Sequence, residues 1–439
     1  MILQTGKIEK VKRTITTLIT VVFFMSGTTV KSFAQTANTA AAYTLPDPLV
    51  MNNGGKVRTA RQWNSRRREL IETFSREMYG VAPVRPRTMT FKVFDVNKNV
   101  LDGRATRKQV TVFFDGTVDG PQMDILIYLP NQVQFPVPVV LQLNFDGNHK
   151  TNSDTGIKLP VSWMEPKTIG VVNNRATEAG RGNASGGWDV DMILRHGYGF
   201  ATIYRGDIDP DYADGFKNGV HALYPELQGR GDNFSTMGAW AWGLSRAMDY
   251  LETDKDVDAK QVALFGFSRL GKAALWAGAT DQRFALVISN QSGAGGAKLF
   301  HRAKGENIKR LCTVFPHWFC SNLKKYIDED SILPFDQHMV VSLIAPRPVY
   351  IGSAEGDRNS DPEGEFASAL AADPVYRFLG TEGFPAKKMP GLSEPVVGRL
   401  AYHIRPGGHS VMPYDWEQYL QFIDKYFKGR NTNVIKVKR

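Results

Sequence analysis

Ser268 is the residue whose surroundings most clearly indicate chemistry in this sequence of 439 residues. It stands in residues 266–272, which read GFSRLGK, directly after the apolar run 262–265. This order is typical of a sharp turn between a buried strand and a helix, where small neighbours let both elements approach closely. The second glycine, Gly271, comes one position later than in the usual G-x-S-x-G pattern, and an ordinary turn has a similar sequence. We predict that Ser268 is the nucleophile of a serine hydrolase.

His409 is placed where such a nucleophile needs its base. A serine hydroxyl is a poor nucleophile until a base takes its proton, and doubly wound hydrolases have the chain order serine, acid, histidine. Residues 401–404 predict a late strand, 406–408 (PGG) a turn and 415–426 an amphipathic terminal helix. A loop histidine taken alone is more often an exposed polar residue. The order along the chain favours His409 as the general base.

Asp357 is the first candidate for the acid that orients this histidine. It ends the run 353–357 (SAEGD), which follows the strand-like residues 346–351 (PRPVYI). Glu355 and Asp361 are local alternatives, and a loop carboxylate is usually only solvated. Position along the predicted sheet is what favours Asp357.

The negative charge that develops during acyl transfer needs hydrogen-bond donors. Arg269 would place a guanidinium beside the nucleophile, although a surface arginine is an equal alternative from the residues alone. Residues 144–149 (NFDGNH) follow the strand-like run 137–143 and would line the other side of the site. The same residues also suit a tight turn.

The elements that must position these residues follow from the apolar pattern. Residues 61–78 predict an amphipathic helix, and 237–251 a second helix that Ser235 can cap. The first strand-like runs are joined by short turns, as in antiparallel strands, and the later ones by longer, partly helical segments, as in a parallel sheet. These runs are 89–96, 108–114, 123–128, 137–143, 199–204, 261–265, 286–289 and 349–351. We predict a single α/β-hydrolase domain over residues 35–439, a three-layer α/β sandwich with a mostly parallel central sheet and antiparallel N-terminal strands.

Four motifs together resemble the glucuronoyl esterases of carbohydrate esterase family 15. They are residues 266–272, 291–296 (QSGAGG), 343–348 (LIAPRP) and the histidine of 407–409 (GGH). The resemblance covers most of the chain after residue 34. It implies an α/β-hydrolase that cleaves the ester between lignin alcohols and 4-O-methyl-glucuronic acid on xylan, with no metal or organic cofactor.

Carried over position by position, the resemblance implies roles for six residues: Ser268 as nucleophile, His409 as base, Arg269 as oxyanion stabiliser, Lys272 as a contact to sugar hydroxyls, and His317 with Trp318 in a substrate-lining segment. Many family members have the acid, a glutamate, where this chain has Gln291, and an amide cannot stabilise an imidazolium by charge. Bacterial members with an aspartate after the later strand place the acid at Asp357, where the residues alone also place it. We expect Gln291 to line the substrate site instead.

Two further departures from the family pattern concern the sharp turn around Ser268, the nucleophile elbow, and the sugar pocket. Fungal members have a cysteine where this chain has Phe267, so a disulfide at the elbow is not expected. A tryptophan of the family's sugar pocket has no counterpart near residues 358–359, which read RN.

The N-terminus predicts export. Basic residues, the apolar segment 15–25 and the small residues that end at Ala34 are typical of a secretory signal peptide, so residues 1–34 would be removed and the protein secreted or periplasmic. The formal charge of +10 falls to +6 without these residues, and no basic tract remains. We expect no nucleic-acid or membrane partner. The expected partner is glucuronoxylan or a lignin-carbohydrate ester, bound by a monomer.

The sequence leaves several alternatives open. An acetyl xylan esterase or another carbohydrate deacetylase would use the same triad, and a non-catalytic carbohydrate-binding protein could retain the same scaffold. Cys312 and Cys320, the only cysteines, either form a disulfide across a short loop or remain free thiols.

Overall fold

The computed structural model describes residues 44–183, 187 and 189–428 of the chain. The predicted signal peptide, residues 1–34, lies outside the described residues. The described residues from Thr44 onward form one compact unit, to which all the elements below belong.

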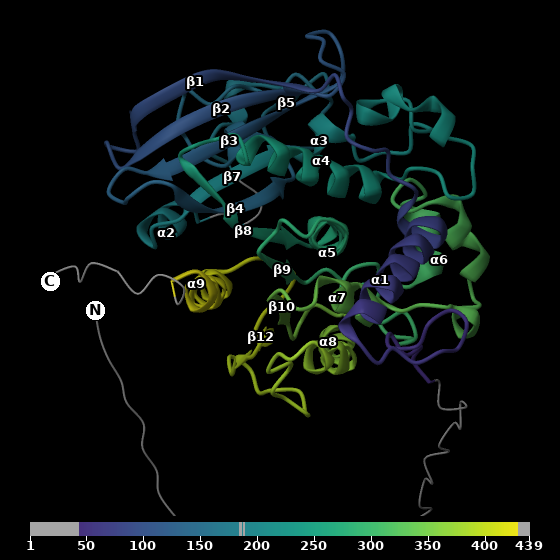
Figure 1. Ribbon diagram of the computed structural model, residues 1–439. Helices are drawn as coiled ribbons and strands as arrows, with labels where there is room; N and C mark the ends of the chain where they lie inside the picture. The colour runs from purple at the N-terminus through teal and green to yellow at the C-terminus, as the bar shows by residue number, and fades with distance from the viewer. Residues whose placement is uncertain (1–43, 184–186, 188, 429–439) are drawn as a thin grey trace, which may run out of the picture. The chain divides into compact units, whose positions relative to one another are not determined.

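Within the described residues, one large sheet of ten strands runs through this unit, in the order β1-β2-β3-β7-β4-β8-β9-β10-β12-β11 (Figure 1). The N-terminal strands pair antiparallel, and β3 also meets β7 antiparallel. From β7 through β4, β8, β9 and β10 to β12 every pairing is parallel. The strands are β1 (Thr90–Val100), β2 (Ala105–Phe113), β3 (Gln122–Pro130), β4 (Val137–Asn144), β7 (Gly199–Tyr204), β8 (Val257–Phe267), β9 (Leu286–Asn290), β10 (Val349–Ala354), β12 (Leu400–Arg405) and the short antiparallel edge strand β11 (Val396–Val397). The predicted antiparallel start and parallel centre are confirmed.

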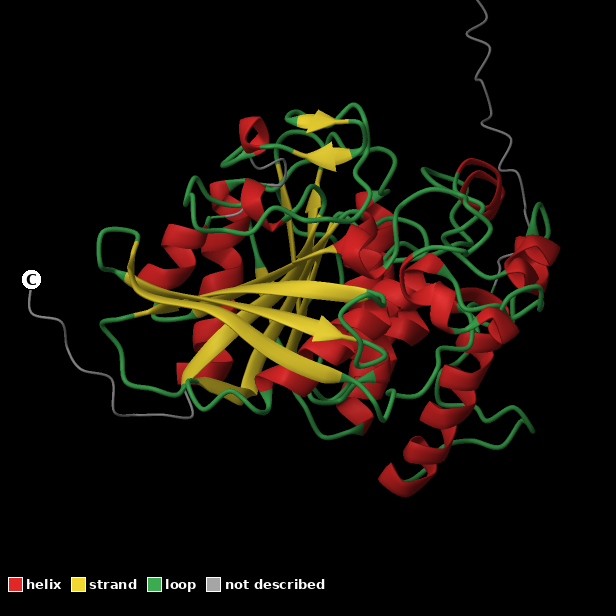
Figure 2. Ribbon diagram, turned by 90° about the horizontal axis from the view of Figure 1, so that it is seen from above, coloured by secondary structure: helices red, strands yellow, loops and turns green. Residues whose placement is uncertain are grey.

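Helices cover both faces of the sheet, so the predicted three-layer sandwich is confirmed (Figure 2). One face packs against α1 (Ala60–Phe74), α4 (Thr236–Leu251), α5 (Arg269–Thr280), α7 (Gln337–Ile344) and α8 (Pro362–Phe378). The other packs against α2 (Val190–Arg195) and α9 (Pro413–Phe427). Shorter elements in the connections are α3 (Arg205–Ile208), α6 (Ile308–Val314) and the separate hairpin of β5 (Val171–Val172) and β6 (Arg175–Ala176).

Local sequence signals account for the ends of these elements. The hydroxyl of Ser235 accepts a hydrogen bond from the backbone N–H of Gly238, so the predicted cap of α4 is confirmed. The helix expected over 61–78 is α1, which continues as a π-helical turn over Ser75–Tyr79. The strands of the sheet centre are buried on both faces, which explains their continuous apolar runs.

Three further findings concern the described residues. Cys312 and Cys320 are free thiols. Among the described residues, no helix is long and apolar enough to cross a membrane, and no group of three or more His, Cys, Asp or Glu side chains could hold a metal ion.

The carboxyl ends of the parallel strands meet at one edge of the sheet, and ligand sites of open α/β sheets lie at that edge. The turns after β7, β8, β10 and β12 therefore come together there. They carry the residues that the sequence singled out.

Candidate active site

Ser268 occupies a strained turn between β8 and α5. Its backbone has a φ of +55°, a conformation that non-glycine residues rarely adopt. A side chain at Gly266 would collide with the carbonyl oxygen of Leu270, and a Cβ at Gly271 would stand only 2.9 Å from Cβ of Ser292. Both glycines are thus needed for close packing around the elbow. The second one, Gly271, allows α5 to pack closely against the loop after β9.

Ser268, His409 and Asp357 form a hydrogen-bonded chain although they come from three different loops. Oγ of Ser268 lies 2.8 Å from Nε2 of His409, and Nδ1 of His409 lies 2.6 Å from Oδ2 of Asp357. Because a carboxylate only accepts, Nδ1 carries the imidazole proton and Nε2 is free to accept the serine proton. The ring of Phe267 packs against the imidazole with 4.7 Å between ring centroids. This is the geometry of a nucleophile, a base and an orienting acid.

Asp357 is the carboxylate within hydrogen-bond distance of His409, and its alternatives, Glu355 and Asp361, have other surroundings. It is 4% exposed and also accepts the backbone N–H of Ser360. Burial opposes ionisation, but the hydrogen bonds from His409 and Ser360 outweigh it and lower the pKa of Asp357 below its usual value. Glu355 is exposed, and Asp361 pairs with Arg302 at 2.7 Å.

Gln291 holds the loop that carries His409. Its Nε2 donates to the carbonyl oxygen of Ser410 at 2.8 Å, and its Oε1 accepts the N–H of Ser410 at 3.1 Å. The guanidinium of Arg405 donates to the same carbonyl oxygen. Gln291 is among the residues that line the cavity next to Ser268, but its side-chain amide donates to and accepts from the backbone of Ser410, the residue after His409. An amide suits this place because it donates and accepts at once, which a carboxylate cannot do.

Arg269 reaches the site from the first position of α5. Its guanidinium pairs with Asp211 at 2.6 Å and lies over the ring of Trp318 at 4.7 Å. The first backbone N–H groups of a helix have no acceptor within the helix, and the helix dipole adds partial positive charge there. The N-terminus of α5 therefore presents both an amide and a guanidinium next to Ser268, as an oxyanion site requires.

Asp211, in the loop after β7, is a functional candidate that the sequence reasoning missed. Its carboxylate accepts hydrogen bonds from Nε2 of His317 at 2.9 Å and Nε1 of Trp318 at 2.7 Å. It also pairs with Arg205 and Arg269. Burial opposes its ionisation, but Arg205, His317 and Arg269 outweigh it and hold the pKa of Asp211 well below its usual value. Asp211 lies beyond helix α3, and no local pattern in the sequence distinguished it.

His317 and Trp318 therefore differ in their position. Trp318 lines the catalytic cavity, and it is stacked on Phe315 with 3.7 Å between centroids. His317 is not among the residues that line this cavity and lies behind it, bonded to Asp211. The substrate-lining segment that the resemblance implied thus faces the cavity through its tryptophan.

Beside the triad lies a cavity of about 220 Å³ whose polar wall includes Lys272 and Glu306. The ammonium of Lys272 is buried and donates to the carbonyl oxygens of Ser292 at 2.7 Å and Ala294 at 2.6 Å. Its third contact is to the Glu306 carboxylate at 2.8 Å. Glu306, which the sequence reasoning also missed, keeps part of its side chain exposed to the cavity. Lys272 thus holds Glu306 in place in addition to lining the cavity itself.

Residues 144–149 form the tight turn that was the alternative for them. Oδ1 of Asn144 accepts the N–H of Gly147 at 2.8 Å, and Nδ2 of Asn144 donates to Asn148 at 2.7 Å. These residues do not line the catalytic cavity.

Comparisons with known proteins give consistent matches. Residues 206–380 match the family model described as glucuronyl esterase of fungi. The chain is 49% identical over 393 residues to carbohydrate esterase MZ0003 from an unknown prokaryotic organism, over 88% of this chain and 90% of that protein. It resembles the solved structure of a glucuronoyl esterase from Solibacter usitatus with a TM-score of 0.83 and 46% identity, over 88% of this chain and 98% of that one. It also resembles a promiscuous CE15 esterase from a marine bacterial metagenome with a TM-score of 0.82 and 49% identity, over 88% and 97% of the two chains.

Proposed function

This chain belongs to carbohydrate esterase family 15, and we propose that it hydrolyses esters of glucuronic or 4-O-methyl-glucuronic acid, such as those that join lignin alcohols to glucuronoxylan. It is a serine esterase of the glucuronoyl esterase type, with an α/β-hydrolase fold. The observation that carries the proposal is the chain of hydrogen bonds Ser268, His409, Asp357 at the mouth of a cavity lined by Arg269 and Glu306.

In the first half-reaction, His409 takes the hydroxyl proton of Ser268 while Oγ attacks the carbonyl carbon of the uronate ester. The carbonyl oxygen becomes an oxyanion, which accepts hydrogen bonds from the Arg269 guanidinium and the free amide of α5. The imidazolium, stabilised by Asp357, then gives its proton to the departing alcohol oxygen. The ester bond to the alcohol breaks, and a uronyl group remains bonded to Ser268.

In the second half-reaction, His409 takes a proton from a water molecule that attacks the uronyl carbon. The bond to Oγ of Ser268 then breaks, and the proton returns from His409 to the serine. Glucuronic acid leaves with a free carboxylate, and the enzyme is restored. Throughout, Asp211 keeps the guanidinium of Arg269 at the N-terminus of α5.

The cavity next to the triad suits the sugar ring of a uronate. Glu306 can only accept hydrogen bonds when it is ionised, and sugar hydroxyls are donors. Lys272 supports this role because its ion pair holds the Glu306 carboxylate in the wall. Arg310 lines the same cavity and adds a positive charge to its wall.

One assay tests the proposal. Initial rates are measured for the methyl and benzyl esters of glucuronic acid and for acetylated xylan, with the wild type and Ser268→Ala. We expect hydrolysis of the uronate esters that is lost in Ser268→Ala. A preference for acetyl groups would contradict the uronate assignment, and turnover that does not depend on Ser268 would contradict the nucleophile.

A broader ester specificity is the second candidate function. A relative that is 49% identical is described as a promiscuous CE15 esterase. Side activity on acetylated xylan, with a kcat/KM below that for the uronate esters, would support it. We further propose that the protein acts outside the cytoplasm, where its polymeric substrate lies, on the basis of the signal-like residues 1–34.

A further inference from the structure

A second cavity lies at the same edge of the sheet, and with about 490 Å³ it is larger than the catalytic one. Its walls come from the start of β3, the loop 161–163 and the segment that follows β7. That last segment connects the two cavities, because Tyr212 lines the second cavity and its neighbour Asp211 holds Arg269 in the first. Asp211 and Tyr212, which are adjacent in the sequence, thus belong to the surroundings of the two cavities.

Two half-buried aromatic rings form one wall of the second cavity. Trp163 and Tyr212 pack with 4.5 Å between their ring centroids and an interplanar angle of 45°. The amide of Asn218, another lining residue, donates to the hydroxyl of Tyr212 at 2.7 Å. Apolar ring faces next to a few fixed polar groups are typical of sites for small organic ligands.

Another part of the wall holds the carboxyl groups of Asp124 and Asp207. Asp207 is buried there, where it accepts hydrogen bonds from the Ser162 hydroxyl and, at 3.3 Å, from the Asp124 N–H. Burial and, next, the neighbouring Asp124 carboxylate raise the pKa of Asp207 to about 7. Near neutral pH its carboxyl group can therefore both donate and accept hydrogen bonds. A hydroxyl group of a ligand matches such a partner.

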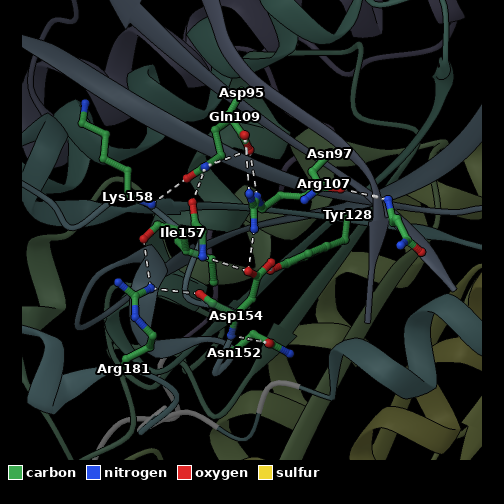
Figure 3. Close-up of polar contacts among 12 residues, drawn as sticks. Asp95, Asn97, Arg107, Gln109, Tyr128, Asn152, Asp154, Ile157, Lys158 and Arg181 are labelled. Atoms are coloured by element: carbon green, nitrogen blue, oxygen red, sulfur yellow. Dashed lines mark hydrogen bonds and ion pairs between the residues drawn. The ribbon is translucent and has the colours of Figure 1, made fainter. Parts of the chain in front are cut away.

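The loop that carries Trp163 is held against the N-terminal strands by a buried polar network (Figure 3). Arg107 on β2 is 5% exposed and pairs with Asp95 at 2.7 Å and with Asp154. Gln109 on the same strand donates to the carbonyl oxygen of Gly156 at 2.9 Å and accepts the N–H of Lys158 at 2.8 Å.

Two more contacts extend this support to the cavity wall. Arg181 donates to the carbonyl oxygens of Asp154 and Ile157, each at 2.9 Å (Figure 3). The hydroxyl of Tyr204, at the end of β7, donates to the carbonyl oxygen of Trp163 at 2.9 Å. The aromatic wall is thus fixed before any ligand arrives, which lowers the entropic cost of binding.

We propose that the second cavity binds a neutral sugar unit of the polysaccharide that carries the glucuronate ester, an inference that rests on the proposed function. A pyranose offers C–H groups to the faces of Trp163 and Tyr212 and hydroxyls to Asp207 and Asn218. An aromatic alcohol in the same place would offer fewer hydroxyl groups to these polar side chains than a pyranose does. The cavity therefore favours the carbohydrate side of the substrate over the alcohol side.

Kinetics with two substrates test this proposal. One is the methyl ester of glucuronic acid, and the other is the same ester carried on a xylo-oligosaccharide. We expect the wild type to have a lower KM for the second substrate. Trp163→Ala and Asn218→Ala should lose about tenfold in kcat/KM for the second substrate, equivalent to about 1.4 kcal/mol, and should keep the wild-type value for the first.

Two controls make the result specific. Phe135→Ala removes an aromatic ring from the loop before β4, where Phe135 is 44% exposed and lines neither cavity, and it should leave both substrates unaffected. Trp163→Phe keeps an aromatic face and should restore much of the loss. If Trp163→Ala does not fold, as judged by circular dichroism, Asn218→Ala carries the test because its side chain is at the surface.

The outcomes separate this inference from the proposed function. The inference would be overturned if the ratio of kcat/KM for the oligosaccharide ester to kcat/KM for the simple methyl ester were the same in the wild type and both variants. Should the wild type hydrolyse neither ester, the proposed function fails. The cavity is then tested by calorimetry of xylotetraose binding to the Ser268→Ala variant. Saturable binding that is lost when Trp163→Ala is added supports the sugar site, and the absence of saturable binding overturns it.

Discussion

Replacement of Asp357 by asparagine should disable the triad while the fold is kept. Asp357 lies 2.6 Å from Nδ1 of His409 and is 4% exposed, so asparagine fits the same space. The change removes the negative charge that stabilises the imidazolium when His409 takes the proton of Ser268. It also allows the amide to donate to Nδ1, which would leave the imidazole in the tautomer that cannot accept from serine.

The size of the effect follows from the geometry. Two unit charges about 4 Å apart interact by about 4 kcal/mol at an effective dielectric constant of about 20. Because the side chain of His409 is 43% exposed, solvent screening reduces this to about 3 kcal/mol, or roughly a hundredfold in kcat. The wrong tautomer adds to the loss, and triads with this substitution lose about 10⁴-fold. We therefore expect kcat to fall by about 10² to 10⁴.

The assay measures kcat and KM for methyl glucuronate with Asp357→Asn, beside Glu355→Gln as a matched control. Glu355 is exposed two residues away, and its variant makes the same change in net charge. KM should change little in both variants, because Asp357 bonds to His409 and not to the substrate. A fall in kcat of less than tenfold in Asp357→Asn, or an equal fall in Glu355→Gln, would refute the reasoning.

Four further outcomes are expected. Arg269→Ala should lower kcat by about 10² to 10³ with little change in KM, which is the usual cost of removing one oxyanion donor. Asp211→Asn should lower kcat by a smaller factor, again with little change in KM. A change confined to KM would mean that Arg269 binds the substrate in its ground state. Gln291→Ala should lower kcat far less than Asp357→Asn, because Arg405 still holds the Ser410 carbonyl; equal losses would assign Gln291 a part in the chemistry. Burial raises the pKa of Glu365 to about 8, above the pKa of this group in the unfolded chain. The contribution of the protonated Glu365 to stability is therefore complete below about pH 4 and is lost as the pH rises through about 8. The Tm of Glu365→Gln should accordingly rise relative to that of the wild type as the pH increases, and a Tm difference that is constant with pH would argue against the raised pKa. Reduction with dithiothreitol should leave Tm unchanged because Cys312 and Cys320 are free thiols, whereas a clear drop would indicate a disulfide.

The sequence by itself determined the sheet, the elbow and the order of the catalytic candidates. Apolar runs such as 262–265 form strands because a parallel strand is buried on both faces, and that requirement is visible in consecutive residues. The serine turn is equally local, since Gly266 and Gly271 lie within the same few residues as the packing that needs them. Chain order then placed His409 and Asp357 in loops at one edge of the sheet, because parallel strands all end there.

Only the tertiary structure decided which carboxylates and amides meet at that edge. The sequence favours Asp357 over Glu355 and Asp361 only by position and resemblance, and the structure shows which of them is the hydrogen-bond partner of His409. The bonds of Gln291 to Ser410 join segments 119 residues apart. Such contacts depend on how loops from different strands fold over one another, and no local pattern in the chain encodes them.

The same reason explains why Asp211, Glu306 and the second cavity were not predicted. Asp211 acts through Arg269 and Trp318, which are 58 and 107 residues away from it. The wall of Trp163 and Tyr212 exists because a network on β2 holds a distant loop in place. Burial, charge pairing and cavity shape are properties of the assembled sheet edge, so they appear only when the chain is folded.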